Sequence, residues 1–167
     1  SPDDPDARWI AGIQPAGGKS AGSRPRAVLE KVAPGWTIGL NDERSLGLVG
    51  EHLGKKDILR TQPVHPGKPV ILTKTVELPA GKKSRLQFAV SHDDAIGADW
   101  QLIIKANGND LHRATISEKT TKDHWHTVDI DLQKFAGKRT KLEIHHLALA
   151  ALPSYAYWDK IEIQTQP

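Results

Sequence analysis

The sequence predicts an all-β protein, built as a two-sheet antiparallel β-sandwich of the jelly-roll type. About eight short segments alternate apolar with polar side chains, which is the period of a strand with one buried face. Turn-forming glycine, proline, asparagine and aspartate residues separate these segments at short intervals. No segment carries a long helical repeat of apolar residues. Together these features favour a sandwich.

The clearest strands come after residue 70. Asn107 and Gly108 predict a tight hairpin turn, because both residues tolerate a positive φ. Phe135 and Ala136 are expected to fill a corner between two strands, and Gly137 to supply a backbone shape that a β-carbon would disfavour. The predicted strands are residues 35–40, 70–79, 85–90, 99–106, 111–117, 126–132, 141–149 and 155–163.

The first part of the chain is harder to assign. Residues 1–34 are rich in Gly, Pro and Ser and predict a linker or a segment wrapped along the sandwich domain, which is expected to span residues 35–167. Residues 46–50 fit a strand or a turn, and residues 51–59 fit one helical turn. Three prolines in residues 57–69 argue against a central strand there.

Composition excludes several classes of protein. The chain has 167 residues and no cysteine, which rules out a disulfide framework, a thiolate nucleophile and a cysteine zinc site. The 23 basic side chains outnumber the 20 acidic ones only slightly and gather in expected turns, which favours solvated turns over a nucleic-acid surface. No apolar stretch reaches the roughly 18–20 residues of a membrane helix, so we expect no membrane insertion.

Three segments resemble the galactose-binding-like jelly-roll superfamily. They are "VELPAGKKSRLQFAVSHD" (residues 76–93), "WHTVDIDLQKFAGKRTKLEI" (residues 125–144) and "AYWDKIEI" (residues 156–163). The resemblance covers residues 70–163. Many members of this superfamily are carbohydrate-binding modules of secreted bacterial enzymes, and others are interaction or structural modules of large extracellular proteins.

The resemblance implies binding rather than catalysis. We expect a non-catalytic module, attached to a larger secreted, periplasmic or cell-surface bacterial protein, with a polysaccharide or other glycan as partner. A structural or protein–protein interaction module is the alternative. The resemblance also implies a structural calcium ion that touches Asp159 in the closing strand, and no other cofactor is expected.

Residues 91–100, "SHDDAIGADW", are expected to form a loop at one end of the sandwich, where rigid sheets fix the ends of a binding loop. His92, Asp93, Asp94 and Asp99 are the candidate ligand-binding residues there, and Arg113 is added from the strand after the Asn-Gly turn. Carboxylates accept hydrogen bonds from sugar hydroxyls, and carboxylate oxygens also suit calcium. An ordinary hydrated turn is the remaining alternative.

Aromatic side chains are the second candidate surface. The chain has five tryptophans but only two Phe and two Tyr, and an exposed aromatic ring can stack on a sugar. Trp100 shares a row with Leu102 and Ile104, which predicts a core position. Trp125, Tyr155 and Trp158 are the candidate binding aromatics, with a buried or capping position as the alternative. Trp158 in particular is opposite in phase to the apolar residues that follow it.

Histidines and catalytic motifs give weaker signals. His126 would lie near His146 if the two late strands paired as a hairpin, but a jelly roll places such strands in different sheets. Surface or hydrogen-bonded histidines are therefore favoured over a transition-metal site. No hydrolase, zinc-protease or phosphate-loop motif is present, so no catalytic residue is assigned.

Overall fold

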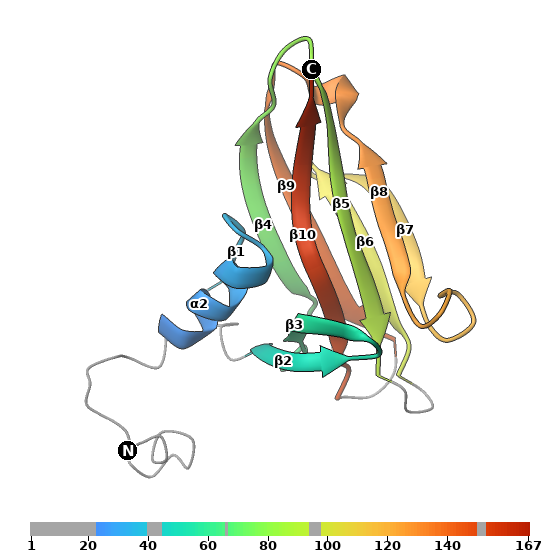
Figure 1. Ribbon diagram of the computed structural model, residues 1–167. Coiled ribbons are helices and arrows are strands. Elements are labelled where there is room, and N and C mark those ends of the chain that lie inside the picture. Colours follow the sequence, from blue (N-terminus) through green and yellow to red (C-terminus); the bar gives the residue numbers. More distant parts are fainter. Residues whose placement is uncertain (1–22, 40–44, 66, 94–97, 150–152) are drawn as a thin grey trace.

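Two five-stranded sheets face each other in the computed structural model, which describes residues 23–39, 45–65, 67–93, 98–149 and 153–167 (Figure 1). The first sheet has the strand order β1-β4-β9-β6-β7, and the second has the order β2-β3-β10-β5-β8. Neighbouring strands are antiparallel in both sheets. The predicted two-sheet sandwich is confirmed.

The described elements are short strands with one α-helix and one 3-10 turn. In chain order they are α2 (Ser23–Val32), β1 (Thr37–Ile38), β2 (Leu46–His52), β3 (Lys55–Thr61), β4 (Val70–Glu77), β5 (Lys83–His92), β6 (Trp100–Ala106), β7 (Asn109–Ile116), β8 (His126–Asp131), η2 (Gln133–Phe135), β9 (Arg139–Ala148) and β10 (Ala156–Gln166).

Both predicted turns have the expected backbone. Asn107 and Gly108 connect β6 to β7 with φ angles of 51° and 86°. Gly137 has a φ of 78° at the corner after η2, where a β-carbon would also lie 3.3 Å from the Cβ of Ala80. That corner carries the chain from β8 in the second sheet to β9 in the first.

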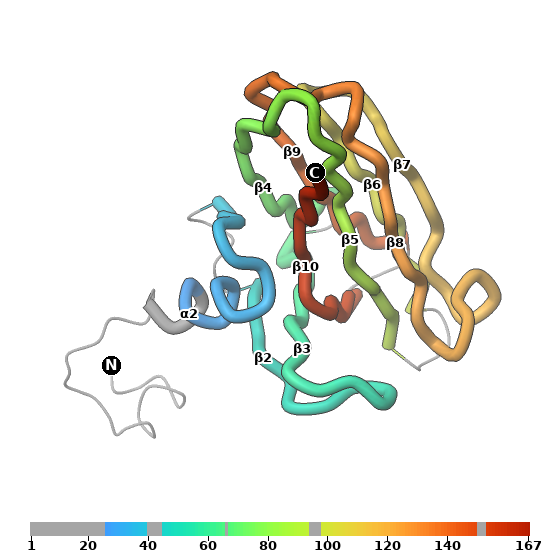
Figure 2. Tube along the Cα trace, turned by 45° about the horizontal axis from the view of Figure 1, so that its top comes forward, coloured from blue at the N-terminus to red at the C-terminus, as the bar shows by residue number. Residues whose placement is uncertain are grey.

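The N-terminal third differs from the sequence-based expectation. Residues 23–32, predicted to be irregular, form the helix α2, whose Leu29 and Val32 are buried in the core. Figure 2 shows α2 against the side of the sandwich next to β2 and β3, which it contacts. Among the described residues, no helix has the length and apolar content to cross a membrane.

The helical turn expected at residues 51–59 is also wrong, because these residues belong to the β2–β3 hairpin. Leu53 and Gly54 make its turn with φ angles of 47° and 89°. β3 is an internal strand between β2 and β10, contrary to the argument from prolines, since the strand ends at Thr61 and the prolines follow it.

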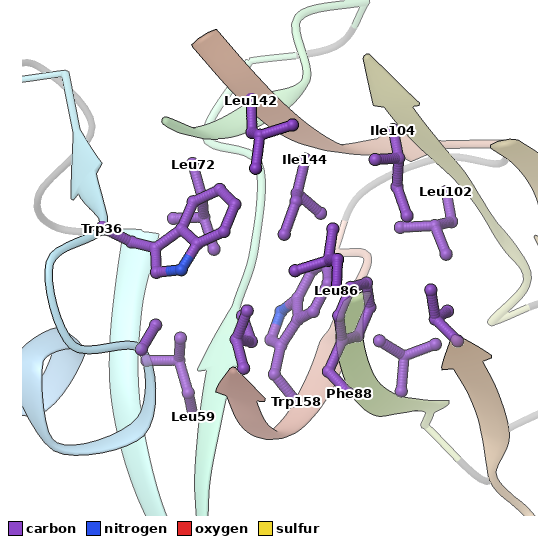
Figure 3. Packing of buried hydrophobic residues seen from close by; sticks show 14 of the residues in the cluster. Trp36, Leu59, Leu72, Leu86, Phe88, Leu102, Ile104, Leu142, Ile144 and Trp158 are labelled. Carbon is purple, nitrogen blue, oxygen red and sulfur yellow. The ribbon is translucent and has the colours of Figure 1, made fainter. Parts of the chain in front are cut away.

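Apolar side chains from both sheets fill the space between them, as the labelled residues in Figure 3 show. Trp158 lies in this core with its ring centroid 5.7 Å from that of Phe88 and 5.4 Å from that of Trp100. A β-bulge between Asp159 and Glu162 inserts one residue into β10 opposite β5. Because the bulge interrupts the alternation, Trp158 before it and Ile161 within it are both buried.

Candidate functional site

Five strand ends meet at one end of the sandwich, which we call the loop end. β5 finishes there at His92, opposite Ala156 at the start of β10, and β8 starts there at His126, opposite Val90. Trp100 and Ile116 pair at the same end of the first sheet. The predicted loop after His92 therefore connects a strand of the second sheet to a strand of the first, although its residues 94–97 lie outside the described part of the chain.

An aromatic cluster covers the outer face of the second sheet near the loop end. The ring of His52 stacks on Tyr157 with centroids 3.5 Å apart and planes within 6°, and it meets Trp125 edge-on at 6.1 Å. Trp125 donates its indole N–H to the carbonyl of Leu53 at 3.0 Å, and Lys55 lies 5.4 Å from the centroid of its ring. The tip of the β2–β3 hairpin thus covers Tyr157 and Trp125, and both are buried.

Four side chains at the edge of this cluster form what we call the rim quartet: Arg60, Asp93, Tyr155 and Tyr157. The guanidinium carbon of Arg60 lies 4.9 Å from the ring centroid of Tyr155. Burial raises the pKa of the Tyr157 phenol, the charge of Asp93 raises it further, and Arg60 acts in the opposite direction. Arg60, Asp93 and Tyr155 are each partly exposed, so this group offers an aromatic face, a cation and an anion side by side.

The structure brings together some of the predicted site residues. His92, Asp93, Trp125 and Tyr155 all lie at the loop end, but only Asp93 and Tyr155 reach solvent to a useful extent. Trp158 is 1% exposed in the core, so the structure removes it from the candidate ligand contacts.

The ring of His92 is also buried and cannot lie flat against a ligand. Asp94 lies outside the described residues. Asp99 is exposed at the start of β6. Arg113 lies on the outer face of the first sheet, where it pairs with Asp110 at 2.8 Å, and it is not part of the rim quartet.

Sequence reasoning missed Arg60, His52 and Tyr157. The available signal was the alternation in residues 55–61, where Ile58 and Arg60 face out and Leu59 and Thr61 face in. The strand was not predicted because prolines follow directly after it, and prolines disfavour a central strand. Tyr157 sits two residues after Tyr155 and therefore shares its face of the sheet.

His146 lies inside the core and is held by polar groups of β3 and of the segment before β10. Trp158 donates its indole N–H to the hydroxyl of Thr61 at 2.9 Å, and that hydroxyl is 2.9 Å from Nδ1 of His146. Nε2 of His146 is 3.1 Å from the hydroxyl of Ser154. Every hydrogen bond in this series has a donor and an acceptor when the Thr61 hydroxyl donates to Nδ1 and a neutral His146 donates from Nε2 to Ser154. Burial lowers the pKa of His146 to about 3.

The Ser154–His146 pair has the residue types of a nucleophile and its base. However, both side chains are buried, and a histidine with so low a pKa is a poor proton acceptor at neutral pH. We therefore assign the pair a structural role.

The other late histidines also lie apart from His146. β8 and β9 belong to different sheets, so His126 does not meet His146 and instead stacks against His112 of β7, with ring centroids 5.9 Å apart. Burial lowers the pKa of His126, and the charge of His112 lowers it further.

The residue expected to bind calcium has a partner within the protein. Asp159 is partly exposed, and its Oδ2 lies 3.6 Å from Nζ of Lys55. Its Oδ1 accepts a hydrogen bond from the backbone N–H of Lys160 at 3.0 Å. The calcium site at Asp159 stays a prediction.

The fold is that of a jelly-roll β-sandwich domain. No family model and no curated protein matches the sequence. Among solved structures, the chain is similar to TmCBM61 in complex with beta-1,4-galactotriose, with a TM-score of 0.57, 15% identity and coverage of 83% of this chain and 94% of the other.

Two other similar structures differ in function from that module. The K3 cleaved adhesin domain of Lys-gingipain from Porphyromonas gingivalis has a TM-score of 0.57, 13% identity and coverage of 81% and 95%. A Stig cyclase from Fischerella sp. has a TM-score of 0.53, 12% identity and coverage of 80% and 86%. At these identities the similarity shows the fold alone, and the fold serves both binding and catalysis.

Proposed function

We propose that this chain is a non-catalytic carbohydrate-binding module of a larger secreted or surface bacterial protein, and that the three partly exposed members of the rim quartet, Arg60, Asp93 and Tyr155, contact the glycan. The observation that carries the proposal is the placement of a partly exposed tyrosine ring beside a guanidinium and a carboxylate at the loop end. The similarity of the fold to a module in complex with a galactotriose supports it.

Each of the three partly exposed members of the rim quartet suits one part of a sugar. The ring of Tyr155 can pack against the apolar C–H face of a pyranose, because an aromatic ring offers a large, flat apolar surface. Arg60 presents a planar set of N–H donors to ring hydroxyls, and Asp93 accepts hydrogen bonds from them. Arg60 already lies against Tyr155, so the site is partly arranged before a ligand binds.

The described tryptophans do not supply a binding platform. Trp36, Trp100, Trp125 and Trp158 are 3%, 0%, 8% and 1% exposed, and Trp9 lies outside the described residues. A sugar site built on an exposed tryptophan would shift the fluorescence of that residue on binding, and the described tryptophans are too buried for this. The proposal therefore depends on Tyr155, and calorimetry is a better assay than tryptophan fluorescence.

The test is a glycan array followed by calorimetry with any glycan that binds. Arg60→Gln should weaken binding about ten- to hundred-fold, because a hydrogen bond to a charged group contributes about 1.5–3 kcal/mol. Tyr155→Ala should weaken binding by a similar factor, because burying a large apolar side chain contributes about 1.5–3 kcal/mol. Arg113→Gln is the matched control, since it removes a partly paired arginine from the other sheet. Loss of binding in the control but not at Tyr155 would place the site on the first sheet and contradict the proposal.

A structural or protein–protein interaction module is the second candidate, and the burial of all four described tryptophans favours it. The similarity in fold to an adhesin domain is consistent with it. If no glycan binds and Tyr155→Ala leaves the folded domain unchanged, this second function replaces the first.

A further inference from the structure

Five basic side chains gather at the end of the sandwich opposite the loop end, where two turns lie together at the top of Figure 1. Lys82 and Lys83 lie where β4 connects to β5, and Lys134, Lys138 and Arg139 lie where β8 connects to β9. We call these five residues the basic end. All five are exposed, and the proposed glycan contacts of the rim quartet use none of them.

Backbone hydrogen bonds hold the two turns of the basic end together. Leu78 accepts a hydrogen bond from the N–H of Gly137 at 2.7 Å and donates to the carbonyl of Lys138 at 3.2 Å. Leu132 donates to the carbonyl of Ser84 at 2.8 Å. The side chains of Leu78 and Leu132 are buried in the core. The backbone that carries the five cations is therefore fixed as one unit, although the two turns are far apart in the sequence.

The two turns contain no carboxylate. Residues 78–84 and 132–139 include all five cations of the basic end and no Asp or Glu. The chain has 23 basic and 20 acidic side chains, so the other 18 basic residues are outnumbered by the acidic ones. The excess positive charge of the protein is therefore concentrated at this end of the sandwich.

The carboxylates that flank the two turns already have partners. Glu77 lies 3.8 Å from Arg139. Asp131 accepts a hydrogen bond from the backbone N–H of Gln133 at 2.8 Å and lies 3.9 Å from Arg85. Within the described ranges, no ion pair joins the four lysines of the basic end to a carboxylate. Their charges are left to water and to an external anion.

From this placement we propose that the basic end binds an anionic polysaccharide, a sugar polymer that carries sulfate or carboxylate groups along its length. Each exposed ammonium group contributes little alone, but several cations on one fixed surface attract a polyanion together. An ammonium group acts as a point charge and does not need the planar geometry that a guanidinium recognises, so either anion suits the four lysines.

Two other kinds of polyanion fit this surface less well. Single-stranded nucleic acids need exposed aromatic rings on which bases stack, and the aromatic residue of the two turns, Phe135, is half-buried with Lys134 over its ring at 5.3 Å. An anionic membrane is bound most firmly where apolar side chains enter it. Among the described residues, the exposed large apolar side chains are Leu48 and Leu149, and neither belongs to the basic end.

The experiment measures binding of the full chain to heparin, polygalacturonate and neutral dextran by calorimetry. Heparin carries sulfate groups and polygalacturonate carries carboxylates, so the two probes also distinguish the preferred anion. We expect binding to at least one of them and no binding to dextran. The affinity should fall at least about ten-fold between about 50 and 200 mM salt, because salt screens exposed charges and competes with them.

The double variant Lys82→Glu, Lys138→Glu should weaken binding to the anionic polymer at least about ten-fold, since it replaces attraction by repulsion in both turns. The matched control is Lys119→Glu, Lys122→Glu, which changes the net charge equally in the connection between β7 and β8 at the loop end. All four lysines are exposed, so both double variants are expected to fold. The control should keep most of the affinity.

The proposal does not rest on glycan binding at the rim quartet, and Tyr155→Ala should leave binding of the anionic polymer unchanged. Failure of either proposal can thus be recognised separately. No binding to heparin or polygalacturonate in about 50 mM salt, where screening is weak, would overturn the basic-end proposal. An equal loss in the two double variants would overturn it too. So would tighter binding to double-stranded DNA or to phosphatidylglycerol vesicles than to both polysaccharides.

Discussion

Acidification should destabilise the protein through His146. The imidazole has a pKa of about 3 in the folded protein, against an ordinary value of 6.5, because burial disfavours its charged form. A shift of roughly 3.5 units corresponds to about 5 kcal/mol at about 1.4 kcal/mol per unit. The folded pKa is below the unfolded one, so this stability is fully present above pH 6.5 and is lost as the pH falls toward 3.

The loss of stability on protonation of His146 is large enough to measure by urea unfolding at several pH values. A domain of this kind is stable by about 5–15 kcal/mol, so the loss is a large share of the total. Urea unfolding between pH 7.5 and 4 should give a free energy of unfolding that falls by up to about 1.4 kcal/mol per pH unit below pH 6 from His146 alone. Carboxylates also titrate in this range and need a control.

His146→Gln is the appropriate control variant, because a glutamine amide can both accept from Thr61 and donate to Ser154. The variant is expected to be less stable at pH 7.5, yet its unfolding free energy should depend less on pH than that of the wild type. Parallel pH curves for the two proteins would refute the argument. If the variant does not fold, a wild-type ring resonance that titrates near pH 6 would refute it instead.

Three further predictions concern the same core and its corners. Thr61→Val should cost about 1–3 kcal/mol in urea unfolding, because it leaves the indole N–H of Trp158 without its acceptor. Gly137→Ala should cost about 1–2 kcal/mol in the same assay, since the residue has a φ of 78° and the new methyl would press on Ala80, and an increase in stability would contradict this. His126→Phe should reduce the acid destabilisation that sets in below about pH 6.5, because burial lowers the pKa of the native histidine, and unchanged pH dependence would count against that explanation.

The features that the sequence predicts correctly are those set by local chemistry. The turn at Asn107 and Gly108 requires positive φ at both positions, and few other dipeptides allow it. The corner glycine, Gly137, is recognisable for the same reason. Regular alternation also identifies strands such as β5, where Leu86 and Val90 are both buried on one face.

The features that cannot be predicted from the sequence depend on contacts between distant parts of the chain. The bulge after Asp159 changes which residues of β10 face the core, and no local signal marks it. The turn at Leu53 and Gly54 lacks an asparagine or aspartate, so the β2–β3 hairpin is inconspicuous in the sequence. Arg60 gains its position only when β3 pairs with β10, which begins almost a hundred residues later along the chain.

The same context explains why a tryptophan-rich sequence need not have a tryptophan binding surface. The indole N–H groups of Trp100, Trp125 and Trp158 donate to Ser91, Leu53 and Thr61 within the protein. A buried indole needs such a partner, since an unsatisfied N–H in the core costs about 1–3 kcal/mol. These three side chains are therefore held as packing elements whose polar atoms are already used. If the chain binds a glycan as proposed, the ligand must contact groups that the fold leaves at the surface, and among the described residues of the loop end these include Tyr155, Arg60 and Asp93.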